Sequence, residues 1–175
     1  MWLVPTASVA AQGEVCATCH EDIAAGREQA TSSHQPVSRG ECSSCHNPHT
    51  SKLPTLLRAP DTDLCLSCHD GLKERLAAGF GHSPVGKDCL ACHLPHFSRT
   101  ESSLLTAADA ALCGECHDLE GSSFGAAHIG IDAGVMNCES CHDPHVSKDP
   151  MLFKANMHAP FVDRSCSDCH LAAGQ

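Results

Sequence analysis

The chain has 175 residues, 14 of them cysteine, and its formal net charge at pH 7 is −10. This acidic balance argues against nucleic acid as a partner, because a phosphate backbone repels a negatively charged surface. Five phenylalanines, one tryptophan and no tyrosine, against 13 glycines and 10 prolines, are too few large side chains for an ordinary hydrophobic core. Something other than packed side chains must therefore supply the apolar interior.

Residues 1–11 form a short apolar run followed by small residues. This pattern is typical of the end of a secretory signal peptide, cleaved near Ala10 or Ala11, and a plain N-terminal arm is the alternative. No segment approaches the run of about 18 apolar residues that a membrane-spanning helix needs. We therefore expect an exported chain without a transmembrane segment.

Seven copies of Cys-x-x-Cys-His use every cysteine of the chain. The motifs are Cys16, Cys19 and His20; Cys42, Cys45 and His46; Cys65, Cys68 and His69; Cys89, Cys92 and His93; Cys113, Cys116 and His117; Cys138, Cys141 and His142; and Cys166, Cys169 and His170. This pattern indicates covalent c-type haem attachment, in which two thiols bond the haem and the following histidine binds its iron. The sequence thus predicts seven covalently bound haem c groups.

The histidines outside the motifs match the irons in number. They are His34, His49, His82, His96, His128, His145 and His158. Equal numbers and regular placement favour a second axial histidine for every iron, although any one of them could be an ordinary surface residue. Methionine is the competing ligand, but Met136, Met151 and Met157 cluster near the C-terminus and could not serve all seven haems.

The motifs alternate, because three of them continue into Pro-His, at His49, His96 and His145. A unit consists of a plain motif, a lone histidine and an extended motif. We expect a single heptahaem domain over residues 12–175, made of repeats 12–64, 65–112 and 113–165 and a truncated fourth unit, 166–175.

Gly and Pro punctuation predicts a mostly irregular chain with short α-helices and little or no β-sheet. We expect helices at Glu21–Ala30 and Asp70–Ala78, and turns that begin near Asp61 and Asp109 and lead into motifs.

The paired motifs with an intervening histidine and a final Pro-His resemble the doubled-CXXCH multihaem cytochromes, over essentially Cys16–His170. That group includes decahaem conduits in outer-membrane porins, periplasmic electron carriers and subunits of extracellular cytochrome filaments. The resemblance implies a distal ligand for each haem. His49, His96 and His145 would serve the plain motifs at Cys16, Cys65 and Cys113; His34, His82 and His128 the extended motifs at Cys42, Cys89 and Cys138; and His158 the motif at Cys166. A neighbouring subunit could also supply a ligand.

Two other uses of the cysteines fit less well. Structural zinc takes Cys-x-x-Cys motifs in pairs and needs no histidine after each, whereas seven is odd. Seven Cys-x-x-Cys disulfides would be strained redox bonds rather than structural cross-links.

Iron with two strong axial ligands has no open position for a substrate, so the sequence predicts electron transfer rather than catalysis. We expect an extracellular or cell-surface conduit that associates with itself into filaments and exchanges electrons with other redox proteins. A soluble periplasmic carrier or a conduit in a porin or membrane complex is the alternative. A multihaem reductase with one open haem is less favoured, since the chain has no Cys-x-x-Cys-Lys motif and no tyrosine.

Overall fold

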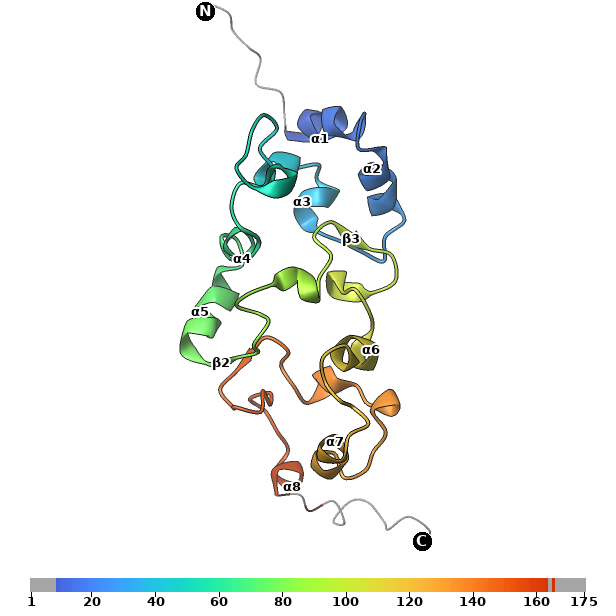
Figure 1. Ribbon diagram of the computed structural model, residues 1–175, viewed down its shortest axis with the longest axis vertical. Coiled ribbons are helices and arrows are strands. Elements are labelled where there is room, and N and C mark those ends of the chain that lie inside the picture. Colours follow the sequence, from blue (N-terminus) through green and yellow to red (C-terminus); the bar gives the residue numbers. More distant parts are fainter. Residues whose placement is uncertain (1–8, 164, 166–175) are drawn as a thin grey trace, which may run out of the picture.

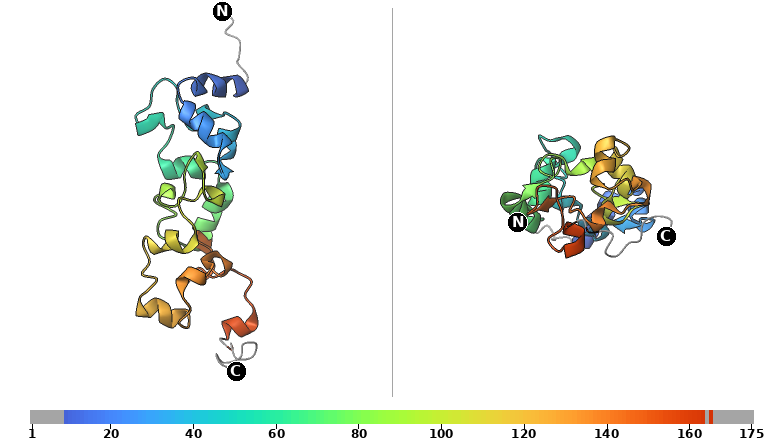
Figure 2. Two further views of the ribbon diagram at one scale, coloured as in Figure 1. Left: turned by 90° about the vertical axis from the view of Figure 1, so that its right-hand side faces the viewer. Right: turned by 90° about the horizontal axis from the view of Figure 1, so that it is seen from below.

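The computed structural model describes residues 9–163 and 165. The chain is drawn out along one long axis, with α1 (Val9–Ala17) at one end and α8 (Ala159–Val162) at the other (Figure 1). Figure 2 shows the same elongated form from the side and a small cross-section from below. Successive repeats therefore follow one another along the axis.

Short helices and turns alternate with irregular chain. The other helices are α2 (Glu21–Glu28), α3 (Gln35–Ser38), α4 (Asp61–Leu66), α5 (Asp70–Ala78), α6 (Asp109–Gly114) and α7 (Ser122–Ala127). The 3-10 turns are η1 (Cys42–Ser44), η2 (Pro54–Leu56), η3 (Cys89–Ala91), η4 (Ser102–Leu104), η5 (Ala133–Val135) and η6 (Cys138–Ser140). The strands are β1 (Ser32–Ser33), β2 (Phe80–Gly81), β3 (Phe97–Ser98) and β4 (Val146–Ser147). This confirms the predicted fold class.

The strands join consecutive repeats. β1 pairs antiparallel with β3, and β2 pairs antiparallel with β4. In both ladders a strand that precedes a lone histidine meets a strand that follows a Pro-His. The predicted helix at Glu21–Ala30 ends at Glu28 because the Thr31 N–H donates to the Ser98 carbonyl, 2.8 Å away, and leads the chain into β1. The predicted helix at Asp70–Ala78 is confirmed as α5.

The described part of the chain has almost no side-chain core. Its buried hydrophobic residues are Val85, 9% exposed, and Val146, 4% exposed, and the one fully buried side chain is that of Ser98. So little burial cannot offset the conformational entropy lost on folding. None of the described helices is long and apolar enough to cross a bilayer.

Candidate haem-binding sites

Each of the six described motifs closes a short helical or 3-10 turn. In the plain motifs the first cysteine lies in the last turn of α1, α4 or α6, and in the extended motifs it begins η1, η3 or η6. In all six described motifs the histidine N–H donates to the carbonyl of the first cysteine, at 2.9–3.0 Å. The local backbone is therefore set for attachment before any long-range contact is considered.

Thiols of successive motifs are neighbours along the whole described row. The first cysteines meet within each repeat, as Cys16 with Cys42, Cys65 with Cys89 and Cys113 with Cys138. Between repeats, Cys45 lies near Cys68, and Cys92 near Cys113 and Cys116. The attachment edges of successive haems thus follow in single file from repeat to repeat.

Burial and these contacts together favour the neutral form of the Cys65 and Cys138 thiols. Burial first, and then the neighbouring Cys89 thiol, raise the pKa of Cys65 to about 11. Burial, Cys113 and the Asp109 carboxylate raise the pKa of Cys138 to about 12. Neutral thiols can lie side by side without charge repulsion, so the chain can hold adjacent attachment points close together.

Histidine rings come together in five pairs, each of one motif histidine and one spare histidine. The centroid distances are 6.3 Å for His34 and His69, 6.1 Å for His46 and His96, 5.9 Å for His82 and His117, 5.8 Å for His93 and His145, and 6.3 Å for His128 and His142. With a metal–nitrogen bond of about 2 Å and about 1.1 Å from ring nitrogen to ring centroid, two imidazoles on opposite sides of one metal have centroids roughly 6 Å apart. Each pair therefore has the spacing of two axial ligands on one iron.

Most of these pairs cross a repeat boundary, which differs from the pairing that the resemblance implied. His34 faces His69 of the next repeat rather than His46, and His96 faces His46 of the preceding repeat rather than His69. The next boundary repeats the arrangement, with His82 facing His117 and His145 facing His93. Only His128 faces its expected motif histidine, His142.

The strands account for this exchange. The His34 N–H donates to the His96 carbonyl, and the His82 N–H donates to the His145 carbonyl, both at 2.9 Å. Each of these bonds continues a ladder, β1 with β3 or β2 with β4. The lone histidine of one repeat is therefore fixed beside the Pro-His histidine of the next repeat. The ring of the lone histidine faces a motif histidine of the next repeat, and the ring of the Pro-His histidine faces a motif histidine of the preceding one.

A backbone carbonyl holds one ring in four of the pairs, and in the pair of His128 and His142 carbonyls hold both rings. Nδ1 of the motif histidines His46, His93 and His142 lies 2.7–3.0 Å from the carbonyls of Thr55, Ser103 and Met151. Nδ1 of the spare histidines His34, His82 and His128 lies 3.0–3.2 Å from the carbonyls of Pro95, Pro144 and Phe124. Because a carbonyl only accepts, each Nδ1 must carry the proton, which leaves Nε2 as the lone-pair nitrogen for iron.

A repeated loop presents the carbonyls that orient the extended-motif histidines. Thr55 and Leu56 have φ of 52° and 59°, and Ser103 and Leu104 have φ of 55° and 60°. A left-handed conformation is unfavourable for these side chains. A serine hydroxyl holds the loop, since Ser98 Oγ donates to the Leu105 carbonyl at 2.9 Å and Ser51 Oγ to the Leu57 carbonyl. We did not predict this loop, although Ser51, Ser98 and Ser147 recur after each Pro-His.

The neutral form is favoured for the rings of His96 and His145. Burial, followed by the facing imidazole of His46, lowers the pKa of His96 below its ordinary value. Burial and the facing imidazole of His93 do the same for His145. Neutral imidazole is the form that binds a metal. Ring spacing, ring orientation and charge therefore all fit the axial ligands of haem.

Some predicted site residues are not brought together. Cys166, Cys169 and His170 lie outside the described residues. His20 and His49 face no other ring within the described chain, and His49 and His158 are exposed. Among the described residues, His20, His49 and His158 belong to none of the five pairs.

Comparison with known proteins supports this arrangement. The family model for the doubled CXXCH motif matches residues 34–74 and 82–121. Each matched segment begins at a lone histidine and includes the plain-motif histidine that it faces. The chain is 32% identical over 114 residues to "Multiheme cytochrome MtrA" of Shewanella baltica, which covers 64% of this chain and 34% of the relative.

A second relative matches over most of the chain. "High-molecular-weight cytochrome c" of Nitratidesulfovibrio vulgaris is 27% identical over 177 residues, covering 89% of this chain and 30% of the relative. The chain thus spans about a third of the length of these curated relatives. The motif cysteines and the paired histidines would hold haem, and the iron of a bound haem would supply one-electron redox chemistry. The motifs, the ligand geometry and these relatives support a multihaem c-type cytochrome, similar to proteins with the doubled CXXCH motif.

Proposed function

We propose that the chain is an electron conduit of seven bis-histidine haems that works outside the cytoplasm as a subunit of an extracellular filament. The observation that carries the proposal is the unbroken sequence of thiol contacts, from Cys16 and Cys42 to Cys113 and Cys138. Haems anchored at such neighbouring points lie close enough for electrons to pass from each to the next. The helices α1, α4 and α6, which carry the first cysteines of the plain motifs, follow one another along the long axis (Figure 1).

Saturated irons support electron transfer without catalysis. Each of the five paired histidine sets offers an iron both axial ligands, which leaves no position for a substrate. On this proposal the chain is not an enzyme. Its partners are other redox proteins that reach the terminal haems.

The filament is favoured over a diffusing carrier by the elongated form of the described chain (Figure 1). A soluble periplasmic carrier or a component of a porin complex is the second candidate. It is favoured by the similarity to "Multiheme cytochrome MtrA". The two candidates differ in whether the protein associates with itself.

Electron microscopy of the haem-loaded protein, with a size-exclusion profile of the same sample, separates them. Ordered filaments are the expected result. A monodisperse monomer at all concentrations would contradict the filament and favour the carrier. Turnover of nitrite or hydroxylamine by the loaded protein would contradict the proposal that it is not an enzyme.

A further inference from the structure

The two repeat boundaries have the same backbone pairing but different side chains on it. Six residues after the plain-motif histidine, α2 has Gly26 where α5 has Arg75. The residue directly after the extended-motif histidine is Leu94 at the first boundary and Asp143 at the second. The first boundary is therefore uncharged at the two positions that carry opposite charges at the second.

At the first boundary an aromatic ring fills the space between helix and loop. The Phe97 ring lies so close to Gly26 that a Cβ there would be 2.1 Å from its Cζ. Phe97 is the counterpart of Val146, because each pairs with the residue directly before a lone histidine. The helix and the strand thus meet here through an apolar contact.

At the second boundary an ion pair fills the same place. Arg75 Nη2 donates to Asp143 Oδ2 and, at 2.6 Å, to the Val146 carbonyl. Asp143 Oδ1 accepts from the His145 N–H at 3.0 Å and from the Val146 N–H at 3.2 Å. The guanidinium and the carboxylate therefore connect α5 of the second repeat to the Pro-His of the third.

This ion pair lies beside an axial ligand. The His145 ring centroid is 5.8 Å from that of His93, the spacing of two ligands on one iron. Burial and the facing imidazole of His93 lower the pKa of His145. The Asp143 carboxylate opposes this shift of the His145 pKa, more strongly than the Arg75 guanidinium adds to it. Both charges therefore act on the ligand ring.

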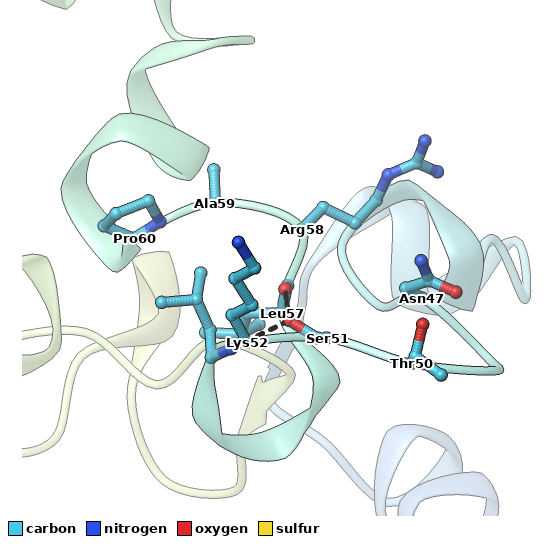
Figure 3. A pocket seen from close by; sticks show the side chains of 9 residues that line it. Asn47, Thr50, Ser51, Lys52, Leu57, Arg58, Ala59 and Pro60 are labelled. Carbon is cyan, nitrogen blue, oxygen red and sulfur yellow. Dashed lines mark hydrogen bonds between the residues drawn. The ribbon is translucent and has the colours of Figure 1, made fainter.

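The first repeat has the same hydrogen bond to its Pro-His without the charge. Asn47 Oδ1 accepts from the His49 N–H at 3.1 Å, as Asp143 does in the third repeat. The cations of that loop lie elsewhere. Arg58 donates to a backbone carbonyl at 2.7 Å, and the Lys52 side chain extends into a cavity of about 610 Å³ that the loop lines (Figure 3). An amide oxygen is thus sufficient for the hydrogen bond, and the charge of Asp143 is additional to it.

We propose that the Arg75–Asp143 pair acts through His145 to set the reduction potential of the haem on Cys89 and Cys92, an inference that rests on the bis-histidine haems of the proposed conduit. Ferric iron gains one electron to become ferrous, so reduction removes one positive charge from the haem. A nearby carboxylate therefore favours the ferric state and lowers the potential, whereas a guanidinium raises it. Because the carboxylate has the stronger effect at the ring, the pair as a whole lowers the potential.

The haem row is then unequal along its length. The haem on Cys42 and Cys45 has the same kinds of ligand, a motif histidine and a Pro-His histidine of the next repeat. At its boundary the Phe97 ring packs on Gly26, and no charge pair is present. Two haems with matching ligands thus differ in the charges beside one ligand.

Two variants of the haem-loaded protein test the two charges separately. Asp143→Asn keeps an oxygen acceptor for the His145 N–H, as Asn47 does for its own Pro-His, and should raise the potential of one haem per chain. Arg75→Met removes the cation and should lower the potential of the same haem. The β2–β4 ladder and the bond from Lys148 Nζ to the last carbonyl of α5, at 2.5 Å, hold the boundary in both variants. The measurement is a potentiometric titration followed by the absorption of the reduced haems.

Matched controls lie on the same helix. Glu74→Gln and Lys73→Met each remove one charge from an exposed residue of α5 whose side chain bonds to no other residue of the described chain. Their potentials should stay close to those of the parent. Arg75→Lys keeps the positive charge and should return the potential toward the parent value.

Two further readouts assign the shifts to one haem and to charge. Adding Cys89→Ser and Cys92→Ser should abolish the shifts of both variants, whereas adding Cys42→Ser and Cys45→Ser should leave them in place. Raising the ionic strength from about 0.01 M to about 1 M shortens the screening length from about 30 Å to about 3 Å. The shifts should therefore shrink in high salt, which a rearranged ligand would not reproduce.

The outcomes separate this inference from the proposed conduit. Asp143→Asn and Arg75→Met could both raise the potential and open the haem to carbon monoxide. That result would show that the pair only holds the ligand in place, and it would overturn the inference. Shifts no larger than those of the controls, in a parent protein that binds no carbon monoxide, would overturn the inference alone. A parent protein that already binds carbon monoxide at this haem would overturn the bis-histidine ligation of the conduit as well.

Discussion

Replacing His34 by glycine should open the haem on Cys65 and Cys68, in the next repeat. The His34 ring centroid lies 6.3 Å from that of His69, and its Nδ1 is held by the Pro95 carbonyl at 3.2 Å. A glycine removes the whole imidazole, so this iron loses one axial ligand while its thioether bonds remain. Its reduction potential should rise, because it loses a strong nitrogen ligand.

The expected size of the effect is one haem per chain. Because the other four ring pairs do not include His34, the variant should bind one carbon monoxide per chain more than the parent. Because the chain has seven motifs, the added carbon monoxide signal should be roughly a seventh of the signal of a protein in which all seven haems are open. Added imidazole should compete with carbon monoxide for the vacant position and restore the low-spin spectrum.

The assay is the carbon monoxide difference spectrum of the dithionite-reduced, haem-loaded protein. Adding Cys65→Ser and Cys68→Ser to the variant removes the opened haem and should abolish the new signal. Adding Cys42→Ser and Cys45→Ser instead should leave the signal in place. The opposite pattern would mean that His34 serves its own repeat, and it would refute the exchange of ligands across the repeat boundary.

Three further changes test the packing. A Cβ on Gly26 would lie 2.1 Å from Phe97 Cζ. Gly26→Ala should therefore lower the free energy of unfolding by about 1–3 kcal/mol, and with it the melting temperature. Gly71→Ala, which meets nothing within 4 Å on α5, should instead stabilise the protein by about 1 kcal/mol, and equal effects would contradict the contact. Ser98→Ala removes a fully buried hydroxyl that donates to the Leu105 carbonyl and so holds a loop. The free energy of unfolding should fall by about 1–3 kcal/mol, and an unchanged melting curve would refute this expectation. Chain produced without haem attachment should lack a cooperative melting transition by circular dichroism, and a native-like transition would show a core that the structure lacks.

The sequence was sufficient for the features that depend on short spacing. The attachment motifs, the sparse helices, α5 and the lack of a core all follow from local composition and from the number of large side chains. The fold class is confirmed for the same reason, since Gly and Pro act on the few residues around them.

The sequence was not sufficient for contacts between repeats. Two-residue strands such as β1 and β3 carry no recognisable alternation of apolar residues, so nothing indicated that repeats were joined by backbone pairing. Without that pairing, His34 and His96 could not be placed beside each other. The resemblance assigned both to their own repeat, whereas the ladder fixes each opposite a motif histidine of the other.

The equivalence of His158 and His34 was present in the sequence but easy to misjudge. The last motif follows a Pro-His loop, as the plain motifs at Cys65 and Cys113 do, and so resembles the start of a new unit. The backbone at His158 and α8 has the same geometry as that at His34 and α3.

The most direct test of the conduit is the current through haem-loaded filaments between two electrodes, for the parent and for a variant with Cys65→Ser and Cys68→Ser. The variant removes one haem from the middle of the row while leaving both ends of the chain unchanged. If electrons pass from haem to haem along the row, the gap should sharply reduce the current through filaments of equal length. An unchanged current would contradict the account, because the electrons would then travel by a path that does not need the haem at Cys65 and Cys68.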